Sequence, residues 1–413
     1  MKRSTSIVTV VTILTLLVTL FTVLGAAAAP NDPPWTNSTL LPDAETVRFD
    51  TEVYNGKMYM LGFRTGTAGA TDGSVWVLDL ATQVWSDTGV DMPVPVSNYT
   101  IAKLTDAAGV GLYLFGGRDS AGACTTTVQA YYPDTNTTAQ FAADPWTGQV
   151  NGEIVFPGAV EVVGNKAYAW GGFCGTTTDP YVSSDTLIFD PMAAAGSRWT
   201  AGPNLPSGGA YQSSANLDGK VYSIGGDTFD GSSLNPYDNV LMLDPANLGA
   251  GWQSKASLPV PSSGVPGCDQ SRAFGFDTAS GWSLAGQIVL AGCGQWPEDP
   301  TALPDSFLYT AATNSWTTFA SLNQARRNHA GAFIADSNGL TGRMWVGGGY
   351  IPGGTNLGTN LTETYEVTRQ LPTAVTLEDF SSAPSNNMLL LVGLGVALIV
   401  LLGAALRGVT LRP

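Results

Sequence analysis

The sequence predicts an all-β fold, a six-bladed β-propeller closed by an N-terminal strand and followed by a C-terminal transmembrane helix. The first observation is a repeat, because glycine-containing marks recur with steps of 54, 55, 54, 67 and 55 residues. Such a period lies close to that of proteins in which each repeat forms one four-stranded blade. The marks are Gly62-Phe63, Gly116-Gly117, Gly171-Gly172, Gly225-Gly226, Gly292-Cys293 and Gly347-Gly348.

The second observation is that the marks share one local context. A β-rich run precedes each mark, a variable loop of small and polar residues follows, and a second β-rich run comes next. Runs of aromatic and β-branched residues between Gly, Pro, Asn and Asp clusters are typical of strands joined by turns. Tryptophans follow four of the second runs, at Trp85, Trp199, Trp252 and Trp316, and we expect Phe141 to take this place in the second repeat.

These residues resemble the kelch repeat, whose pattern is a strand, a strand ending in Gly-Gly, a loop, a tyrosine-rich strand and a tryptophan. The fourth repeat fits best, with NLDGKVYSIGGDTFDG and then NVLMLDPANLGAGW, and the sixth fits with RRNHAGAFIADSNGLTGRMWVGGG. The resemblance extends from about Trp35 to Val367. The first and fifth repeats depart from the diglycine at Phe63 and Cys293.

The ends of the repeat region predict how the ring closes. The last repeat has no tryptophan strand after Val367, whereas PPWTNSTLLP, with Trp35, stands unassigned at the other end. We therefore expect the N-terminal segment to supply the missing strand and to remove the open sheet edge. The alternative is seven blades, with a hidden unit in the long fifth repeat. The predicted propeller spans 30–369, with blades near 45–90, 97–143, 157–201, 209–256, 268–321 and 328–367 plus 33–39.

Both ends of the chain predict an extracytoplasmic protein held at the cell membrane by a single span. Residues 1–29 have the basic start, apolar run and small residues of a signal peptide, with an uncleaved anchor as the alternative. Residues 388–406 carry no charge and are long enough to cross a bilayer, and the tail 407–413 is basic. The polar segment 370–387 is the predicted stalk. Alternatives are the sortase-like LPTAV at 371–375 and a lipid-anchor signal near 381–383.

Four cysteines in an exported chain favour disulfide bonds. Cys268 and Cys293 flank the first two predicted strands of the fifth repeat, so a hairpin there would place them nearly opposite each other. Cys124 and Cys174 follow the diglycines of adjacent repeats. We therefore predict the pairs Cys268–Cys293 and Cys124–Cys174. A metal centre is not predicted, because no two cysteines are closely spaced.

Composition argues against several kinds of chemistry. The net charge of −15 argues against nucleic-acid binding, which needs a basic surface. The only histidine, His329, begins a predicted first strand, where the kelch pattern implies a structural role. One histidine cannot build the copper site of galactose oxidase, a kelch enzyme. The acidic loop at 227–233 lacks the spacing of an EF-hand, so we expect an ordinary turn there rather than a calcium site. No cofactor is predicted.

The predicted function is noncatalytic recognition of a surface protein or glycan, with oligomeric state left open. Loops on a rigid scaffold are where binding residues concentrate. The candidate ligand-binding residues on the loop face are Arg118, Asp119, Tyr181, Asp227, Tyr237, Arg272, Trp296 and Arg326, with Asp269, Glu298, Arg327, Trp146 and Tyr350 nearby. One alternative is a sugar epimerase or mutarotase, because N-acetylneuraminate epimerase is a six-bladed kelch protein that uses a carboxylate and an arginine. The other is an architectural envelope protein.

Overall fold

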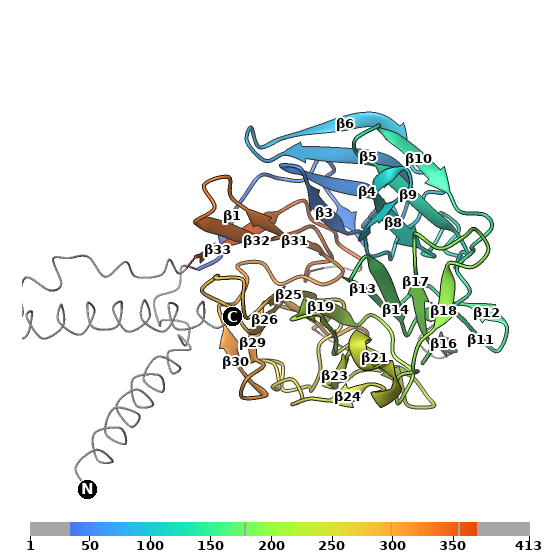
Figure 1. The fold of residues 1–413 in the computed structure, drawn as a ribbon. Helices are drawn as coiled ribbons and strands as arrows, with labels where there is room; N and C mark the ends of the chain where they lie inside the picture. Colours follow the sequence, from blue (N-terminus) through green and yellow to red (C-terminus); the bar gives the residue numbers. More distant parts are fainter. Residues whose placement is uncertain (1–33, 177–178, 299, 354–355, 370–413) are drawn as a thin grey trace, which may run out of the picture. The chain divides into compact units, whose positions relative to one another are not determined.

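The computed structural model describes residues 34–369, apart from 177–178, 299 and 354–355. These residues form six antiparallel sheets that follow one another in sequence order around a common centre (Figure 1). The predicted six-bladed propeller is therefore confirmed, and seven blades are excluded. The predicted signal peptide, stalk, transmembrane helix and tail lie outside the described residues. In the described part of the chain, no helix is long and apolar enough to cross a membrane.

Each blade runs from an inner strand near the centre to an outer strand. Blade one contains β3 (Thr51–Tyr54), β4 (Lys57–Thr65), β5 (Thr71–Asp79) and β6 (Val84–Asp91). Blade two contains β7 (Ala102–Asp106), β8 (Gly109–Phe115), β9 (Val128–Tyr132) and β10 (Thr137–Gln140). Blade three contains β13 (Ala159–Val163), β14 (Lys166–Trp170), β17 (Thr186–Phe189) and β18 (Trp199–Ala201). Blade four contains β19 (Ser213–Leu217), β20 (Lys220–Ile224), β23 (Val240–Leu243) and β24 (Gln253–Ser254). Blade five contains β25 (Arg272–Phe276), β26 (Gln287–Ala291), β29 (Ser306–Thr310) and β30 (Ser315–Phe319). Blade six contains β31 (Ala330–Ala335), β32 (Thr341–Gly347), β33 (Thr362–Thr368) and β1 (Thr36–Asn37).

Short strand pairs extend the loops on one side of the blades. In blade one, β2 (Thr46–Val47) pairs with the end of β4. The other pairs are β11 (Gln149–Val150) with β12 (Glu153–Ile154), β15 (Phe173–Gly175) with β16 (Pro180–Val182), β21 (Asp227–Phe229) with β22 (Leu234–Pro236), and β27 (Cys293–Gly294) with β28 (Ala302–Leu303). One 3₁₀ helix, η1 (Pro245–Ala250), begins after the capping residue Asp244.

The ring closes as predicted, because the N-terminal strand β1 completes blade six. Thr36 and Asn37 pair antiparallel with Thr364 and Glu363 of β33. Trp35 is 2% exposed and packs 5.6 Å from the ring of Tyr365. The first described residues are therefore part of the last blade.

In blades three to six, the tryptophan of the repeat joins the blade to the one before it. The indole N–H of Trp199, Trp252 and Trp316 donates to a backbone carbonyl that follows the outer strand of the preceding blade, at distances of 2.9–3.2 Å. Trp35 donates in the same way to Ala320 at 2.9 Å, so it has the role of a blade tryptophan. Blade two has Phe141 at this place, as expected, and lacks this bond.

The diglycines allow neighbouring blades to approach closely. The first glycine of each of the first five marks has positive φ, such as 61° at Gly171 and 56° at Gly225, a conformation that glycine adopts without steric cost. A Cβ at Gly225 would collide with the carbonyl oxygen of Cys268 in the next blade. In blade six the structural equivalent is Gly348-Gly349, one residue later than expected, because β32 continues through Gly347.

Both predicted disulfide bonds are present. Cys268–Cys293 links the start of blade five to its diglycine position, and Cys124–Cys174 links the loops of blades two and three. The described residues contain no free cysteine.

We predict that Trp35→Ala lowers the free energy of unfolding by ~3–5 kcal/mol, as expected for removal of a buried tryptophan. The loss arises because the substitution removes both the packing on Tyr365 and the bond to Ala320 that close the ring. Urea unfolding followed by fluorescence measures it. Trp85→Ala is the matched control, since Trp85 is half-buried and its indole N–H has no hydrogen-bond partner. An equal loss in both variants would contradict the closing role of Trp35.

Candidate functional site

One residue from each blade meets at the propeller axis, two to four residues before the start of the inner strand. The residue that directly precedes each of them in the chain forms a β-bridge with the loop that follows the diglycine, as Ser97 does with Arg118 and Arg327 does with Tyr350. We call these six residues the axial ring: Arg48, Asn98, Pro157, Tyr211, Gln270 and Asn328. The repeat therefore brings to one point residues that are spread over the whole chain.

Backbone hydrogen bonds pass along the axial ring from blade to blade. Asn98 N–H donates to the carbonyl of Arg48 at 2.8 Å, and Asn328 N–H donates to that of Gln270 at 2.8 Å. Arg48 N–H donates to Asn328 at 3.0 Å, which carries the series across the join between blades six and one. Gln270 N–H donates to Tyr211 at 3.0 Å. The series is interrupted at Pro157, which has no N–H to donate.

The backbone of the axial ring is strained. Arg48, Asn98, Tyr211, Gln270 and Asn328 all have φ between 49° and 58°. Asparagine tolerates this left-handed conformation, whereas arginine, glutamine and tyrosine adopt it at a cost. Strain of this kind concentrates at functional sites, where the surrounding structure holds it in place. The ring is therefore a candidate site on backbone grounds alone.

Three arginines gather at this mouth, which we call the axial mouth. Arg48 and Arg327 lie over the ring of Tyr350, with the guanidinium carbons 5.4 and 4.6 Å from its centre. Arg118 lies over the rings of Phe156 and Phe173, at 5.5 and 5.3 Å. In the part of the chain that the structure describes, none of the three arginines forms a salt bridge.

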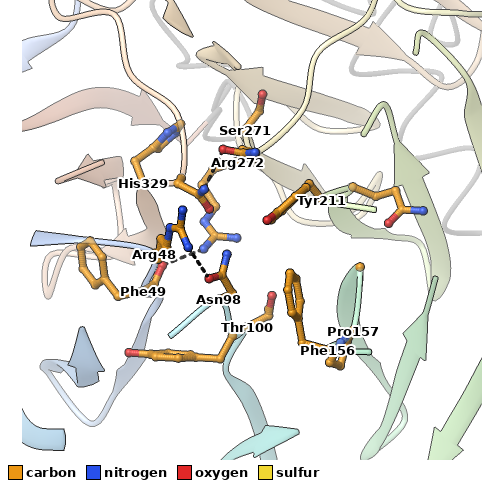
Figure 2. Close-up of a pocket in the computed structure, with 15 residues that line it drawn as sticks. Arg48, Phe49, Asn98, Thr100, Phe156, Pro157, Tyr211, Ser271, Arg272 and His329 are labelled. Carbon is orange, nitrogen blue, oxygen red and sulfur yellow. Dashed lines mark hydrogen bonds between the residues drawn. The ribbon is translucent and has the colours of Figure 1, made fainter. Parts of the chain in front are cut away.

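Tyr211 stands where the fields of these arginines overlap. Burial raises the pKa of its hydroxyl, and the charges of Arg48, Arg118 and Arg327 act in the opposite direction. Figure 2 shows Arg48 and Tyr211 reaching toward the middle of the mouth from opposite sides, with Asn98 accepting a bond from Arg48. The tyrosine also packs on the aromatic wall, which we define as Phe156, Phe173 and Trp296.

The cavity at the axial mouth is small, about 40 Å³. Burial lowers the pKa of both Arg118 and Arg327, which shows that their charges are poorly solvated. Arg48 and Arg118 are partly exposed, whereas Arg327 lies behind them at 5% exposure. The mouth therefore offers positive charge to a group the size of a carboxylate rather than to a whole ligand.

A pair of buried carboxyl groups, Asp227 and Asp269, lies behind the mouth. Both side chains are fully buried, and their four carboxyl oxygens have no hydrogen-bond partner among the described residues. Burial raises the pKa of Asp269 to about 7, and burial together with the charge of Asp269 raises the pKa of Asp227.

The structure brings some of the predicted site residues to the mouth. Arg118 and Trp296 belong to it, and Tyr237 lies nearby, with its hydroxyl 3.4 Å from the amide nitrogen of Gln212. Asp227 lies behind it in the buried pair. Tyr181 pairs with Cys174 in the loop hairpin β15–β16, so it lies on the loop side of blade three.

Other predicted site residues have structural contacts instead. Arg326 is fully buried and is paired with Glu363 at 2.7 Å, so it braces blade six and is not open to a ligand. Arg272 pairs with Asp50 at 3.3 Å and donates to the carbonyl of Phe49. Asp119 accepts bonds from the N–H groups of Ala121 and Ala123 within its own turn. These charged residue types suit ligand binding, but hydrogen bonds and ion pairs within the protein already occupy the side chains.

His329 and the acidic loop also have local roles. His329 is fully buried, and burial lowers the pKa of its imidazole well below the usual value, so the ring is neutral. In the loop at 227–233, Asp230 accepts bonds from the N–H groups of Ser232 and Ser233. Among the described residues, no three His, Cys, Asp or Glu side chains gather as a metal site.

Sequence reasoning missed Arg48, Asn98 and Tyr211. They stand one residue after each bridge, but only Asn98 and Asn328 share a residue type, so no common residue marks the position in all six blades. The available signal was positional, because each of these residues lies two to four places before the start of an inner strand.

Comparisons with known proteins agree with this architecture. A family model described as the KLHDC2/KLHL20/DRC7 Kelch-repeats domain matches residues 49–264. Alpha-scruin and beta-scruin of Limulus polyphemus are 27% and 26% identical over 194 and 196 residues, which is 46% and 45% of this chain. The matched part is only 19% of each scruin. The solved structure of YjhT superposes with a TM-score of 0.56 at 17% identity, covering 82% of this chain and 98% of that one.

We predict that Asp269→Asn flattens the pH dependence of stability. A carboxyl group whose pKa is raised on folding stabilises the native state below its unfolded value of ~3.9. That contribution is lost as the pH rises through the folded value of about 7. The wild-type protein is therefore expected to lose stability between about pH 4 and pH 7, the span of those two pKa values, and the variant to lose less.

Urea unfolding across this pH range tests the expectation. Asp91→Asn, at an exposed position on β6, is the control and should follow the wild type. A variant at Asp269 that loses as much stability as the wild type would show that the pair does not carry this titration.

Proposed function

The chain belongs to the kelch-repeat β-propeller family, and we propose that its propeller is a noncatalytic recognition module for a carboxylated glycan at the cell surface. The observation that carries the proposal is the charge of the axial mouth. A chain with 33 acidic and 18 basic residues places three arginines there without a salt bridge in the described structure. An external anion would supply the negative partner that these arginines lack.

The guanidinium group suits this task. It presents a planar set of donors that matches the two oxygens of a carboxylate. The Nε atoms of Arg48 and Arg118 lack a partner within the described protein, whereas the terminal nitrogens of Arg118 donate to the carbonyls of Gly122 and Gly175. A cavity of about 40 Å³ admits one acidic group while the remainder of the ligand rests on the surface. This geometry favours capture of a terminal group over enclosure of a substrate.

The aromatic wall supports a sugar as the carrier of that group. Trp296 is partly exposed beside Tyr211, and Tyr181 lies on the neighbouring hairpin. Flat aromatic faces with a polar handle suit the mixed apolar and hydroxylated faces of a sugar. A protein side chain or terminus could present the same carboxylate, and the test below separates the two carriers.

The location at the cell surface rests on the sequence. The predicted signal peptide and C-terminal span would hold the propeller outside the cell, and two disulfide bonds fit an oxidising compartment. Under this proposal, the full-length chain fractionates with membranes and is accessible to protease from outside.

We predict that the propeller binds glucuronate but not glucose, since only the first carries a carboxylate. Arg48→Gln and Arg118→Gln should each weaken glucuronate binding by about 10-fold to 100-fold, the loss of a charged hydrogen bond worth ~1.5–3 kcal/mol. Calorimetric titration or a glycan array measures this. Raising the salt concentration should also weaken binding.

Arg343→Gln is the matched control, because Arg343 lies on β32, outside the mouth, and pairs with Asp336. Equal binding by both sugars, or by all variants, would overturn the proposal. Binding of acidic peptides but not of acidic glycans would assign a protein ligand. No binding to either class would favour an architectural role.

A second candidate function is exchange of anomers of a sugar acid, and the pair Asp227–Asp269 favours it. An acid that holds its proton near neutral pH can act in general acid–base catalysis. NMR exchange spectroscopy of N-acetylneuraminate with the purified propeller tests this, with Asp269→Asn as the variant. Exchange at the uncatalysed rate would exclude the enzyme.

A further inference from the structure

A second and larger cavity lies farther along the axis, enclosed by the inner strands of the blades. Its volume is about 360 Å³, within the range of small-molecule sites. Arg272 and Thr100 border both this cavity and the axial mouth, so they form the partition between the two. We call the larger cavity the lumen. It opens to solvent beside Glu52 and Lys103, whose side chains are 27% and 42% exposed.

The charges of the lumen do not balance. Five charged side chains border it, and four of them are paired, Lys103 with Glu52 at 2.7 Å and Arg272 with Asp50 at 3.3 Å. The fifth, Glu161 on β13, has no cationic partner among the described residues. Its carboxylate accepts a hydrogen bond from the N–H of Val162 at 3.0 Å, whereas the nearby hydroxyl of Ser214 donates to the carbonyl of Val160. One negative charge is therefore left facing the cavity.

The surroundings make that charge costly. Burial raises the pKa of Glu161 to about 7, with the negative charges of Glu52 and Asp50 adding to the effect. The carboxylate nevertheless keeps part of its surface on the cavity. A cation placed in the lumen would neutralise it directly, and no side chain in the described residues does so.

The opposite wall of the lumen is apolar. Phe274 on β25 and Phe333 on β31 border it, together with small residues. Gly331 leaves the room through which Arg272 crosses to Asp50, since a Cβ there would lie 3.1 Å from the Cβ of Arg272 and from the ring of Phe274. Blades five and six thus contribute an aromatic surface across the lumen, and blade three contributes the acid.

We propose that the lumen is a binding site for an organic monocation, a primary amine with a compact apolar body. The ammonium group would pair with Glu161, and the body would lie against Phe274 and Phe333. Asn216, which also borders the lumen, already donates to the carbonyl of Val162. This site is independent of the axial mouth and takes a ligand of opposite charge.

Calorimetric titration with 2-phenylethylammonium tests the proposal, with 2-phenylethanol as the uncharged ligand of the same shape. The amine should bind and the alcohol should bind at least ~10-fold more weakly, as one lost charged contact predicts. Glu161→Gln keeps the size and hydrogen-bonding capacity of the side chain and should lower amine affinity to the same extent. Glu153→Gln, on the exposed strand β12, should bind like the wild type.

A proton readout separates this role from a structural one. Below the pKa of about 7, Glu161 is partly protonated, so amine binding should release a proton and make the enthalpy depend on the buffer. The groups that also face it, Asp50, Glu52, Lys103 and Arg272, remain in Glu161→Gln, where the buffer dependence should disappear. Unchanged affinity in that variant, equal binding of the alcohol, or no binding of the amine would each overturn the proposal.

Discussion

The close approach of neighbouring blades at the axis is the constraint on which the rest of the structure depends. Each diglycine lets the backbone of one blade reach the backbone of the next, as the N–H of Gly226 does to Cys268 at 2.8 Å. The same approach forces the following residues into a tight circle, which gives Arg48 and Tyr211 their left-handed backbone. The geometry of the axial mouth is thus a result of how blades pack, and the side chains on that circle are free to vary from blade to blade.

Charge is distributed unevenly around that axis. The mouth carries arginines without salt bridges, whereas the lumen beyond Arg272 carries one carboxylate more than its cations can pair. The ion pair of Asp50 and Arg272 stands between the two regions and separates fields of opposite sign. Because these fields lie in poorly solvated surroundings, they are screened less than charges on the outer surface. The two cavities are therefore suited to ligands of opposite charge.

The fold could be predicted from the sequence because the same pattern of strands, glycines and aromatic residues recurs six times. The glycines, the tryptophans and the placement of Trp35 followed from backbone approach and sheet closure, and the disulfide pairs followed from the register of the blades. The site could not be predicted in the same way. Arg48 and Tyr211 share a position but no residue type, and Glu161 stands out only when the partners of Glu52 and Asp50 are known. Arg326 illustrates the reverse case, since its type suited binding but Glu363 neutralises it in the core.

The pairing of β1 with β33 has a mechanical consequence. The two strands are antiparallel, so the N-terminal end of β1 lies beside the C-terminal end of β33. Tension applied between the two ends of the propeller would act on the outermost pair first and would open the pairs in succession, as a zipper opens. A ring held together by many distributed contacts would then yield to a small directed force, at the place where its two ends meet.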